Sequence, residues 1–501
     1  MKRLLLLSLF LSFIISGYAQ VSKTVNVTTP GTLSTVLTST GLATITNLTI
    51  TGTIDARDFV TMRDSMSVLA VVDLSAVTIA AYTGTGGTDG NASITYPDNE
   101  LPQYAFFNPF NSLLNHSFTT IVIPSSIISI GDDAFAYCKD LTSIAIPSSV
   151  TSIGVNAFLS CSGLITVDAN NLNYSSKDGV LFNKNQTTLI QCPVSKTGSY
   201  AIPSSVASIE DFAFIYCNGL TSVAIPTSVT SIGKHVFESC NGLTSVIIPS
   251  SVTSIGDYAF ASCSGLITVD ANNPNYSSKD GVLFDKNQTT LIQCPVSKTG
   301  SYTIPSSVTS IGVYAFVSCK DLTSIAIPSS VISFRMGAFG DCSGLTSLII
   351  PSSVTSIGDF AFWNCTGLTS LYASATSPVN LSSLYFVFLG VNTNGCTLYV
   401  PKGSLSLYKA AYLWNGFVNI AEFTPTPTSV TSITTSALKG YTQNGQLIVT
   451  GMNQGETLTV YTIHGTTIYS HTTDGNQVVV NLPARGIYIV KAGAQSVRVV
   501  D

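Results

Sequence analysis

The sequence contains few charged residues. Only 9% of its 501 residues are Asp, Glu, Lys or Arg, whereas about a quarter is usual for a soluble domain. The formal net charge is −5, and the basic residues are scattered along the chain. A protein that binds nucleic acid needs a concentrated basic surface to neutralise the phosphates. We therefore predict no nucleic-acid partner.

Sequence signatures of catalysis and of metal binding are also missing. The four histidines, His116, His235, His464 and His471, lie far apart in the sequence. No HExxH, GxSxG, GxGxxG, P-loop or CxxC pattern occurs. His235 and Cys240 are the nearest Cys/His neighbours, but the equivalent repeats fill the position of His235 with other residues. We predict no catalytic residue, no cofactor and no metal, and thus a protein that is not an enzyme.

Long apolar runs are missing after residue 20. The first residues, MKRLLLLSLFLSFIISGYAQ, combine two cations, a short apolar run, and Gly17 and Ala19 before Gln20. This pattern is typical of a cleaved signal peptide, and the run is shorter than the roughly 20 apolar residues that span a membrane. We predict a signal peptide over 1–19, no transmembrane segment, and a protein that is secreted or attached to the outer cell surface.

What the chain does contain is a repeat. Eight units of 23 residues align on a cysteine, and they begin at Phe118, Leu141, Thr197, Leu220, Leu243, Thr299, Leu322 and Leu345. Two inserts of 33 residues, 164–196 and 266–298, interrupt the series and give a second repeat of 102 residues. A fixed period of this size indicates a solenoid, in which each unit buries its apolar residues against its neighbours.

Within a unit the apolar residues occupy positions 1, 4, 6, 10, 13, 17, 18 and 21. This spacing fits neither a helix nor a long strand, and it favours a coil that closes once per unit. Position 6 is always Ile and position 7 always Pro, which predicts a short strand that ends at the proline. Gly at position 14 predicts a turn with positive φ. Glu210 and Arg335 replace that glycine, so their turns should differ from the others.

Two polar ladders run through the repeats, and each has two interpretations. Eight of the eleven cysteines share position 21. They are either buried thiols that pack as small apolar groups or partners in disulfides. Serines occupy positions 9 and 12 of every unit. Their hydroxyls either satisfy backbone groups at the turns or form a row that binds a glycan.

The pattern L-x-x-I-x-I-P-x-x-V-x-x-I-G-x-x-A-F-x-x-C resembles the BspA-like leucine-rich repeats of bacterial surface proteins. The resemblance covers about 118–372 and implies a secreted or surface protein that binds other macromolecules. Residues 20–117 resemble an N-terminal capping region, in which 54–66 is expected to be helical. Residues 373–421 resemble a C-terminal cap, with a strand and then an amphipathic helix carrying Leu407, Tyr408, Ala411, Tyr412 and Trp414. In the inserts, GVLF and TTLIQCP predict a hairpin.

The sequence pattern changes after the linker 422–429, whose TPTPTS run is rich in proline. Residues 430–501 contain short alternating segments between Gly and Asn turns, which predict a small β-sandwich. This region resembles the C-terminal sorting domain of type IX secretion cargo in Bacteroidetes, through Gly465, Leu482, Gly486, Tyr488, Val490 and Gly493. The resemblance implies that 430–501 contacts the type IX secretion machinery. The overall fold class is mainly β, a leucine-rich-repeat solenoid followed by this sandwich.

Specificity must come from the repeat positions that vary, which are 15, 16, 19 and 20. We expect them to lie along one side of the array, where aromatic residues are typical of binding hot spots. Packing between coils is the alternative role. The candidate binding face comprises Tyr137, Phe212, Tyr216, His235, Tyr258, Tyr314, Phe360 and Trp363. Two functions follow: binding of a protein or glycan ligand, as in adhesion or host interaction, or a passive surface layer or scaffold.

Overall fold

A computed structural model describes residues 20–423 except 91–92 and 112–117, and residues 438–500 except several turns between strands. The predicted signal peptide, His116 and most of the linker lie outside the described residues. The chain divides into two compact units, Met1–Phe423 and Thr424–Asp501. No helix in the described ranges is both long and apolar enough to cross a membrane.

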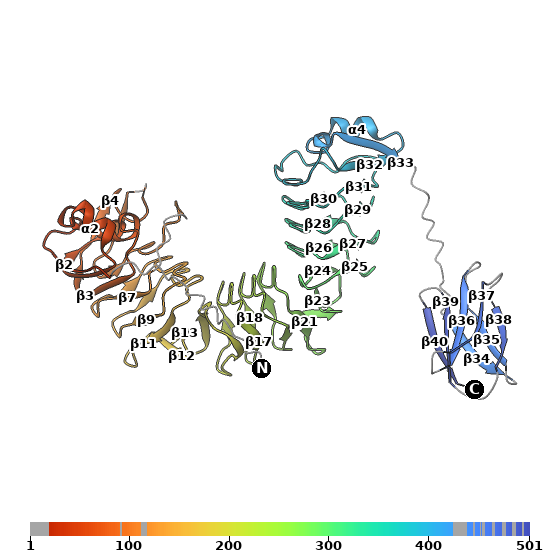
Figure 1. Ribbon diagram of the computed structural model, residues 1–501, viewed down its shortest axis with the longest axis horizontal. Helices are drawn as coiled ribbons and strands as arrows, with labels where there is room; N and C mark the ends of the chain where they lie inside the picture. Colours follow the sequence, from red (N-terminus) through yellow and green to blue (C-terminus); the bar gives the residue numbers. More distant parts are fainter. Residues whose placement is uncertain are drawn as a thin grey trace, which may run out of the picture. The chain divides into compact units, whose positions relative to one another are not determined.

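The first unit is a stack of coils (Figure 1). Each repeat contributes a strand at about positions 3–6 to one side of the stack, where neighbouring strands pair in parallel, for example Ser245 with Leu266. The strands of this side are β1 (Ser22–Val27), β2 (Asn47–Ile54), β3 (Val71–Ile79), β7 (Thr120–Val122), β9 (Ser143–Ile146), β11 (Leu164–Val167), β15 (Gly198–Ala201), β17 (Leu220–Ala224), β19 (Ser245–Ile248), β21 (Leu266–Val269), β25 (Gly300–Thr303), β27 (Leu322–Ala326), β29 (Ser347–Ile350), β31 (Ser370–Ala373), β32 (Thr397–Pro401) and β33 (Asn419–Phe423).

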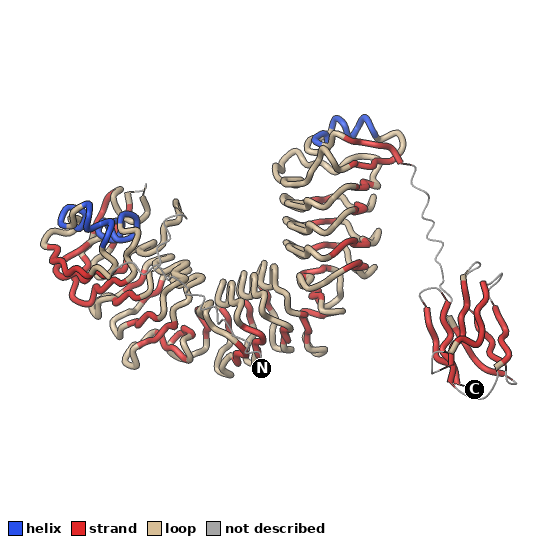
Figure 2. Tube along the Cα trace, viewed as in Figure 1, coloured by secondary structure: helices blue, strands red, loops and turns tan. Residues whose placement is uncertain are grey.

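A second row of two-residue strands forms at positions 12 and 13, and the rest of each coil is turn (Figure 2). These strands also pair in parallel, as Ser231 does with Ser254. They are β6 (Glu100–Leu101), β8 (Ser129–Ile130), β10 (Ser152–Ile153), β16 (Ser208–Ile209), β18 (Ser231–Ile232), β20 (Ser254–Ile255), β26 (Ser310–Ile311), β28 (Ser333–Phe334) and β30 (Ser356–Ile357). The hairpin of β4 (Tyr82–Gly84) and β5 (Ile94–Tyr96) precedes them.

The core lies between these two rows and contains the residues that the repeat pattern predicts. Phe at position 18 is at most 2% exposed in all eight units, and successive rings stack, as Phe237 does on Phe260 at 5.4 Å between centroids. In three units the strand ends at the position-6 isoleucine, as at Ile146 before Pro147, and in the other five it ends one residue earlier. The solenoid and the place of its core are therefore confirmed.

Both polar ladders have structural roles. All eleven cysteines are free and buried, so the interpretation as packed thiols is confirmed and the disulfides are not formed. Position-9 serines donate to the position-10 carbonyl of the preceding unit. Such bonds join Ser228 to Val206 at 2.6 Å and Ser251 to Val229 at 2.7 Å. These hydroxyls satisfy the backbone between coils, which is the role that turn serines commonly have.

The prediction for glycine at position 14 is wrong. The glycines with positive φ do not include Gly154, Gly233, Gly256 or Gly358. Glycine is needed here because the preceding coil lies too close: a Cβ on Gly256 would lie 2.6 Å from the Lys234 nitrogen. Glu210 and Arg335, which replace this glycine, each line a cavity beside an insert, and their backbone still forms the usual turn. Each closes with the usual bond to the residue three positions later, at 3.3 and 3.1 Å.

Each insert adds an antiparallel sheet to the second row of strands. In the first insert β12 (Tyr174–Lys177), β13 (Val180–Asn183) and β14 (Thr188–Gln191) pair in this order, and β14 continues in parallel to β16. The second insert repeats this with β22 (Tyr276–Lys279), β23 (Val282–Asp285) and β24 (Thr290–Gln293). The predicted hairpin is confirmed. The apolar core divides into separate clusters near residues 180 and 282, which are the first residues of β13 and β23.

Short helices lie at both ends of the solenoid. Before the repeats come α1 (Leu33–Val36), α2 (Ser39–Thr44), α3 (Ala56–Val60) and η1 (Thr61–Ser65). The expected helix over 54–66 is thus present, and Asp55 and Asp58 form its capping box. After the repeats come α4 (Leu405–Ala410) and η3 (Trp414–Gly416). Tyr408 and Trp414 are buried, but Leu407 within α4 and Tyr412 beyond its end at Ala410 are nearly half exposed.

The second unit consists of two antiparallel sheets around a core of its own. One sheet has the order β34 (Lys439–Gln443), β35 (Gln446–Thr450), β38 (Gln477–Asn481), and the other β37 (Thr467–Thr472), β36 (Thr457–Thr462), β39 (Ile487–Ala492), β40 (Gln495–Val500). Leu447, Val460, Tyr488 and Val490 belong to the shared core. This arrangement is the predicted small sandwich. Gly465, Gly486 and Gly493, which carry part of the sorting-domain resemblance, lie outside the described residues.

Candidate functional site

Seven of the eight predicted face residues have a left-handed backbone. Position 16 holds Phe212, His235, Tyr258, Tyr314 and Phe360, and position 20 holds Tyr137 and Tyr216, all with φ between 51° and 62°. This conformation costs a non-glycine residue roughly 1–2 kcal/mol. Trp363, at position 19, is the eighth candidate and has no positive φ.

Hydrogen bonds between coils explain why the strained conformation recurs. The N–H groups at positions 16, 18 and 20 donate to the carbonyls at positions 15, 17 and 19 of the next unit. In one unit Phe212, Phe214 and Tyr216 donate at 2.8, 3.0 and 3.0 Å. The left-handed residues turn the N–H groups toward the next coil, and these bonds offset the strain because a buried unpaired N–H would cost more.

Four position-16 rings form a continuous stack, which we call the aromatic ladder: Phe212, His235, Tyr258 and Tyr314. Centroid distances along it are 4.6, 4.4 and 4.9 Å, and the first two pairs are within 9° of parallel. The last step crosses the second insert. The ladder ends at Gly337, which occupies position 16 of the next unit and has no ring. A side chain does not fit there, since a Cβ would lie 2.5 Å from the Tyr314 ring. Beyond it, Phe360 stacks on Phe386 at 5.1 Å.

The ladder is neither fully buried nor fully exposed. All four rings are half-buried, and each stacks on one or two neighbouring rings. His235 Nδ1 pairs with the Glu238 carboxylate, which is also half-buried. Burial raises the pKa of Tyr258 and of Tyr314 above the ordinary value, so both hydroxyls stay neutral and able to donate at physiological pH. The two roles considered for these residues, packing between coils and presentation to a ligand, are both compatible with this geometry.

Four candidates surround one hollow beside the ladder. His235, Tyr258, Tyr314 and Trp363 line a cavity of about 320 Å³ together with Glu238, Ala261, Ser262, Val317, Ser318 and Asp341. The Asp341 carboxylate accepts from Ser318 and from the Asn364 amide at 3.1 and 2.7 Å, and it pairs with Lys320 at 3.0 Å. The hollow therefore combines aromatic edges with fixed polar groups, which is the composition of ligand sites.

Position 19 contributes mainly to packing. In most units it is buried, and Ala136, Leu159 and Ile215 form a small apolar cluster of their own. Tyr137 and Phe212 pack against this cluster. Of the variable positions, 16 and 20 therefore supply the outward aromatic surface together with Trp363.

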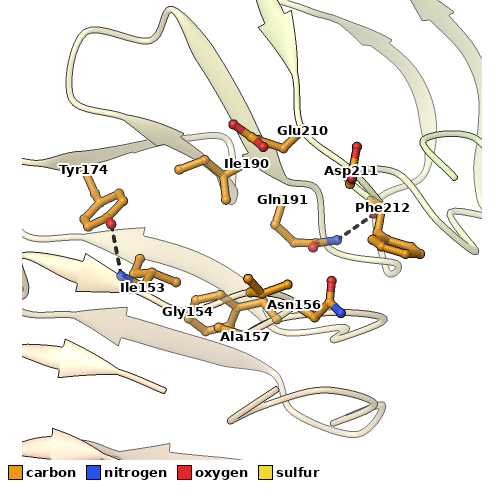
Figure 3. A pocket seen from close by; sticks show the side chains of 12 residues that line it. Ile153, Gly154, Asn156, Ala157, Tyr174, Ile190, Gln191, Glu210, Asp211 and Phe212 are labelled. Atoms are coloured by element: carbon orange, nitrogen blue, oxygen red, sulfur yellow. Dashed lines mark hydrogen bonds between the residues drawn. The ribbon is translucent and has the colours of Figure 1, made fainter. Parts of the chain in front are cut away.

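The inserts open the turn side of the stack. An insert supplies strands to the second row but no turn of its own, so a layer is missing between the turns at Gly154–Phe158 and Glu210–Phe212. A cavity of about 380 Å³ remains there. Figure 3 shows the two turns facing each other across it, with Tyr174, Ile190 and Gln191 of the insert between them. The Tyr174 hydroxyl accepts from the Ile153 N–H at 3.0 Å, and the Gln191 amide donates to the Phe212 carbonyl at 3.5 Å.

The second insert leaves a smaller gap. The equivalent cavity measures about 180 Å³, because Tyr258 and Tyr314 meet across it. At the first insert their counterparts are Asn156 and Phe212, and no ring contact bridges the described residues on either side. The ladder is thus continuous over the second insert and begins at the first.

Tyr137 and Tyr216 belong to a separate hollow. They line a cavity of about 580 Å³ with Lys139, Ser160, Val194 and Asn218. Burial raises the pKa of both tyrosines. The eight candidates therefore fall into three groups: the ladder with Trp363, the pair around this larger cavity, and Phe360 on its own stack.

Sequence reasoning missed the backbone conformation of these positions, although a signal was present. Positions 16 and 20 also hold Asp133, Asn156, Gly337, Asp341 and Asn364, all with positive φ. Asn, Asp and Gly are the residues that adopt the left-handed region most readily. Their concentration at positions 16 and 20 shows where the backbone is left-handed. The glycine at position 14 had led us to place this conformation two residues too early.

In the parts of the chain that the structure describes, no group of three or more His, Cys, Asp or Glu side chains is placed to hold a metal ion. The aromatic positions therefore remain the features with the clearest chemistry for binding.

Comparison with known proteins gives the following matches. The model of the BspA type leucine rich repeat region matches residues 99–201, 193–300 and 294–386, together more than half of the 501 residues. No curated protein matches the sequence significantly.

Several solved structures are similar to the chain. A leucine rich cell surface protein from Faecalibacterium prausnitzii A2-165 is 26% identical, with a TM-score of 0.43, over 65% of this chain and 87% of that one. A leucine-rich repeat protein from Eubacterium ventriosum ATCC 27560 is 28% identical, with a TM-score of 0.39, over 57% of this chain and 67% of that one. The pneumococcal vaccine antigen PcpA is 15% identical, with a TM-score of 0.35, over 81% and 88%.

Proposed function

Because this chain belongs to the BspA type leucine-rich repeat family, we propose that it is a non-enzymatic binding protein of the cell surface or the secreted fraction. Its partner is a macromolecule of the environment, a protein or a glycan, as in adhesion or host interaction. The observation that carries the proposal is the aromatic ladder with its hollow of about 320 Å³. Rigid aromatic residues supply large contact areas at a low entropic cost.

The geometry favours binding over a purely structural role for one reason. Packing between coils is already provided by the inner stack of phenylalanines, such as Phe237 on Phe260. The ladder adds a second stack on half-exposed residues with a strained backbone. The backbone conformation itself recurs in units that lack a ladder ring, as at Asn156 and Gly337, so the support for binding is the presence of large aromatic side chains where Asn or Gly also fits the fold.

A passive surface layer or scaffold is the alternative function. The regular spacing of the coils supports it, since the backbone bonds between turns give length and resistance to proteolysis without any ligand. A pull-down with the whole chain as bait against host-cell and matrix extracts distinguishes the two. The binding function predicts recovery of specific partners, and recovery decreases when Phe212, His235 and Tyr258 are replaced together by Asn. Equal recovery by parent and variant would support the scaffold.

We also propose that the second unit directs export. The sequence resemblance to type IX sorting domains supports this, as does the fold, because Tyr488 and Val490 lie in the core of a two-sheet unit separate from the repeats. With the predicted signal peptide over 1–19, the chain has the two signals that a two-step export route requires. The type IX secretion machinery is then the partner of residues 430–501.

A further inference from the structure

The cavity between Tyr137 and Tyr216 has features that packing alone does not explain. It measures about 580 Å³, and its lining consists of these two tyrosines, Lys139, Ser160, Val194 and Asn218. Tyr137, Ser160 and Tyr216 occupy position 20 in three successive units. The first insert lies between the last two of these units and removes one turn, so the rings of Tyr137 and Tyr216 flank a space instead of a stacked layer.

One lining residue carries an unpartnered polar atom. Ser160 is 2% exposed, and its hydroxyl has no hydrogen-bond partner. A buried hydroxyl without a partner costs roughly 1–3 kcal/mol, and most such groups in native proteins are paired. Ser160 lines the cavity, but its hydroxyl has almost no exposed surface of its own, so a ligand in the cavity reaches it only after a change of the Ser160 rotamer.

The second half of the chain provides an internal comparison. At the same places 102 residues later, the sequence has Ser239, Ser262 and Ser318. There the Ser262 hydroxyl bonds to the Ser318 hydroxyl at 3.3 Å, and the tyrosines of the same hollow, Tyr258 and Tyr314, occupy position 16 and not position 20. Serine thus satisfies the fold at position 20 on both sides of an insert. The two tyrosines at the first insert are additions to that arrangement, and they leave the Ser160 hydroxyl without the partner that Ser262 has.

We propose that this cavity binds one pyranose ring of a glycan. The tyrosine rings present electron-rich faces, to which the C–H bonds of a sugar ring can pack. The Ser160 hydroxyl, the Asn218 amide and the Lys139 ammonium provide hydrogen bonds for the sugar hydroxyls. Lys139 lies 5.9 Å from the centre of the Tyr137 ring, so its charge is at the rim of the site.

A peptide aromatic side chain fits the chemistry less well. It would stack on the tyrosines but leave Ser160 unpaired and displace water from Lys139 and Asn218 without replacing its hydrogen bonds. A sugar ring has an apolar face and a polar edge and uses both sets of groups. This inference deepens the proposed binding function, which it requires, by assigning the ligand class of one part of the face.

The test uses the whole chain and saturation-transfer NMR. The probes are the methyl glycosides of glucose, galactose, mannose, fucose, N-acetylglucosamine and N-acetylgalactosamine, with N-acetyltryptophanamide as the peptide probe. We expect at least one glycoside to bind and its affinity to decrease about tenfold or more in Tyr137→Ser/Tyr216→Ser. Serine occupies the equivalent positions later in the chain, so the variant keeps a compatible backbone. Ile247→Thr/Ile349→Thr, at residues 61% and 57% exposed on β19 and β29, is the control and should bind the sugar as the parent does.

A single substitution separates binding from folding. In Ser160→Ala the unpaired hydroxyl is removed, so the melting temperature should stay the same or increase, while sugar affinity should decrease severalfold. A merely structural hydroxyl would leave affinity unchanged.

The proposal is overturned if no glycoside binds, if binding persists in the double tyrosine variant, or if only N-acetyltryptophanamide binds. These results are distinguishable from a failure of the proposed function. Capture of a protein partner that depends on Phe212, His235 and Tyr258 would stand even if no sugar occupied this cavity.

Discussion

At the residue scale, the strongest feature is the contrast between the inner and outer aromatic stacks. The inner rings at position 18 are buried, and their place follows directly from the repeat pattern. The outer rings at position 16 combine the same stacking with a left-handed backbone and half-exposed edges. The inner stack therefore stabilises the coil, and the outer one is the surface on which sequences of individual units differ.

The inner stack gives a prediction about stability. Replacing Phe260 by Ala should lower the free energy of unfolding by about 3–5 kcal/mol, because it leaves a cavity between stacked rings. Ile247→Ala is the control, since Ile247 is 61% exposed on β19, and it should change stability by no more than about 0.5 kcal/mol. Chemical denaturation measures both. Similar effects in the two variants would contradict the assignment of the core.

The buried thiols give a prediction about pH. Burial raises the pKa of Cys161 and Cys365 to about 12 and of Cys263 to about 11. In the unfolded chain these thiols lose their protons near the ordinary value of about 8.5. Above that pH the unfolded state binds fewer protons than the folded one, so stability decreases as pH rises toward 11 to 12.

The measurement is a series of denaturation midpoints between about pH 7 and 11, together with a thiol-reactive dye at pH 8. The midpoint should decrease from about pH 9 upward. The dye should label the thiols only after denaturation, since all eleven are buried. Rapid labelling of the folded protein would show that the cysteines are accessible and would remove the reason for the raised pKa values.

The roles of residues were predictable where the same residue recurs in every unit. They were not predictable where a contact between neighbouring coils determines the role. The position-18 phenylalanines and the free cysteines follow from the period of 23 residues. The role of Gly256 does not, because its cause is the approach of the Lys234 backbone in the preceding coil. The repeat shows that glycine is favoured at this position. It does not show whether the reason is a positive φ or the lack of space for a Cβ.

At the scale of elements, the inserts determine where the solenoid is open. Their hairpins were predictable from GVLF and TTLIQCP, since alternating apolar residues flank a polar turn. The cavities beside them were not, because they arise from a turn that the insert lacks. The first cavity measures about 380 Å³ and the second about 180 Å³. This difference depends on the side chains beside each gap, which are Asn156 and Phe212 at the first and the contacting pair Tyr258 and Tyr314 at the second.

The packing of turn on turn gives a third prediction. Gly256→Ala places a Cβ 2.6 Å from the Lys234 nitrogen and 2.7 Å from the Gly233 carbonyl carbon, so the coils must separate. We expect a loss of about 1–3 kcal/mol, the usual cost of overpacking. Gly416→Ala is the control because open space surrounds it. Thermal unfolding of both variants provides the measurement, and an unchanged melting temperature for Gly256→Ala would refute the close approach.

At the scale of the whole molecule, the two units have separate cores and can be given separate tasks. The solenoid and the sandwich were both predictable from the sequence, because their periodicities differ: 23-residue units in one and short alternating strands in the other. The ligand was not predictable. It depends on the shape of surfaces that form only when turns from different units are stacked.

Export provides the prediction at this scale. Deleting 430–501 should leave the melting temperature of the repeats unchanged, because the core of the solenoid ends before that region. In the native host the truncated protein should accumulate in the periplasm. Fractionation followed by immunoblotting measures this. Normal amounts of truncated protein at the cell surface or in the medium would contradict a sorting role for the second unit.

The central claim is that the aromatic ladder forms the binding face, and the affinity of a captured partner for ladder variants tests it most directly. The variant Phe212→Asn/His235→Asn/Tyr258→Asn keeps the left-handed backbone, since Asn156 already occupies this position with φ 55°. The control Ile247→Thr/Ile349→Thr alters residues 61% and 57% exposed on the strand side. We predict that the ladder variant binds at least about tenfold more weakly, a loss of about 1.4 kcal/mol, and that the control binds as the parent does. Equal affinity for parent and ladder variant, or a loss only in the control, would contradict the account.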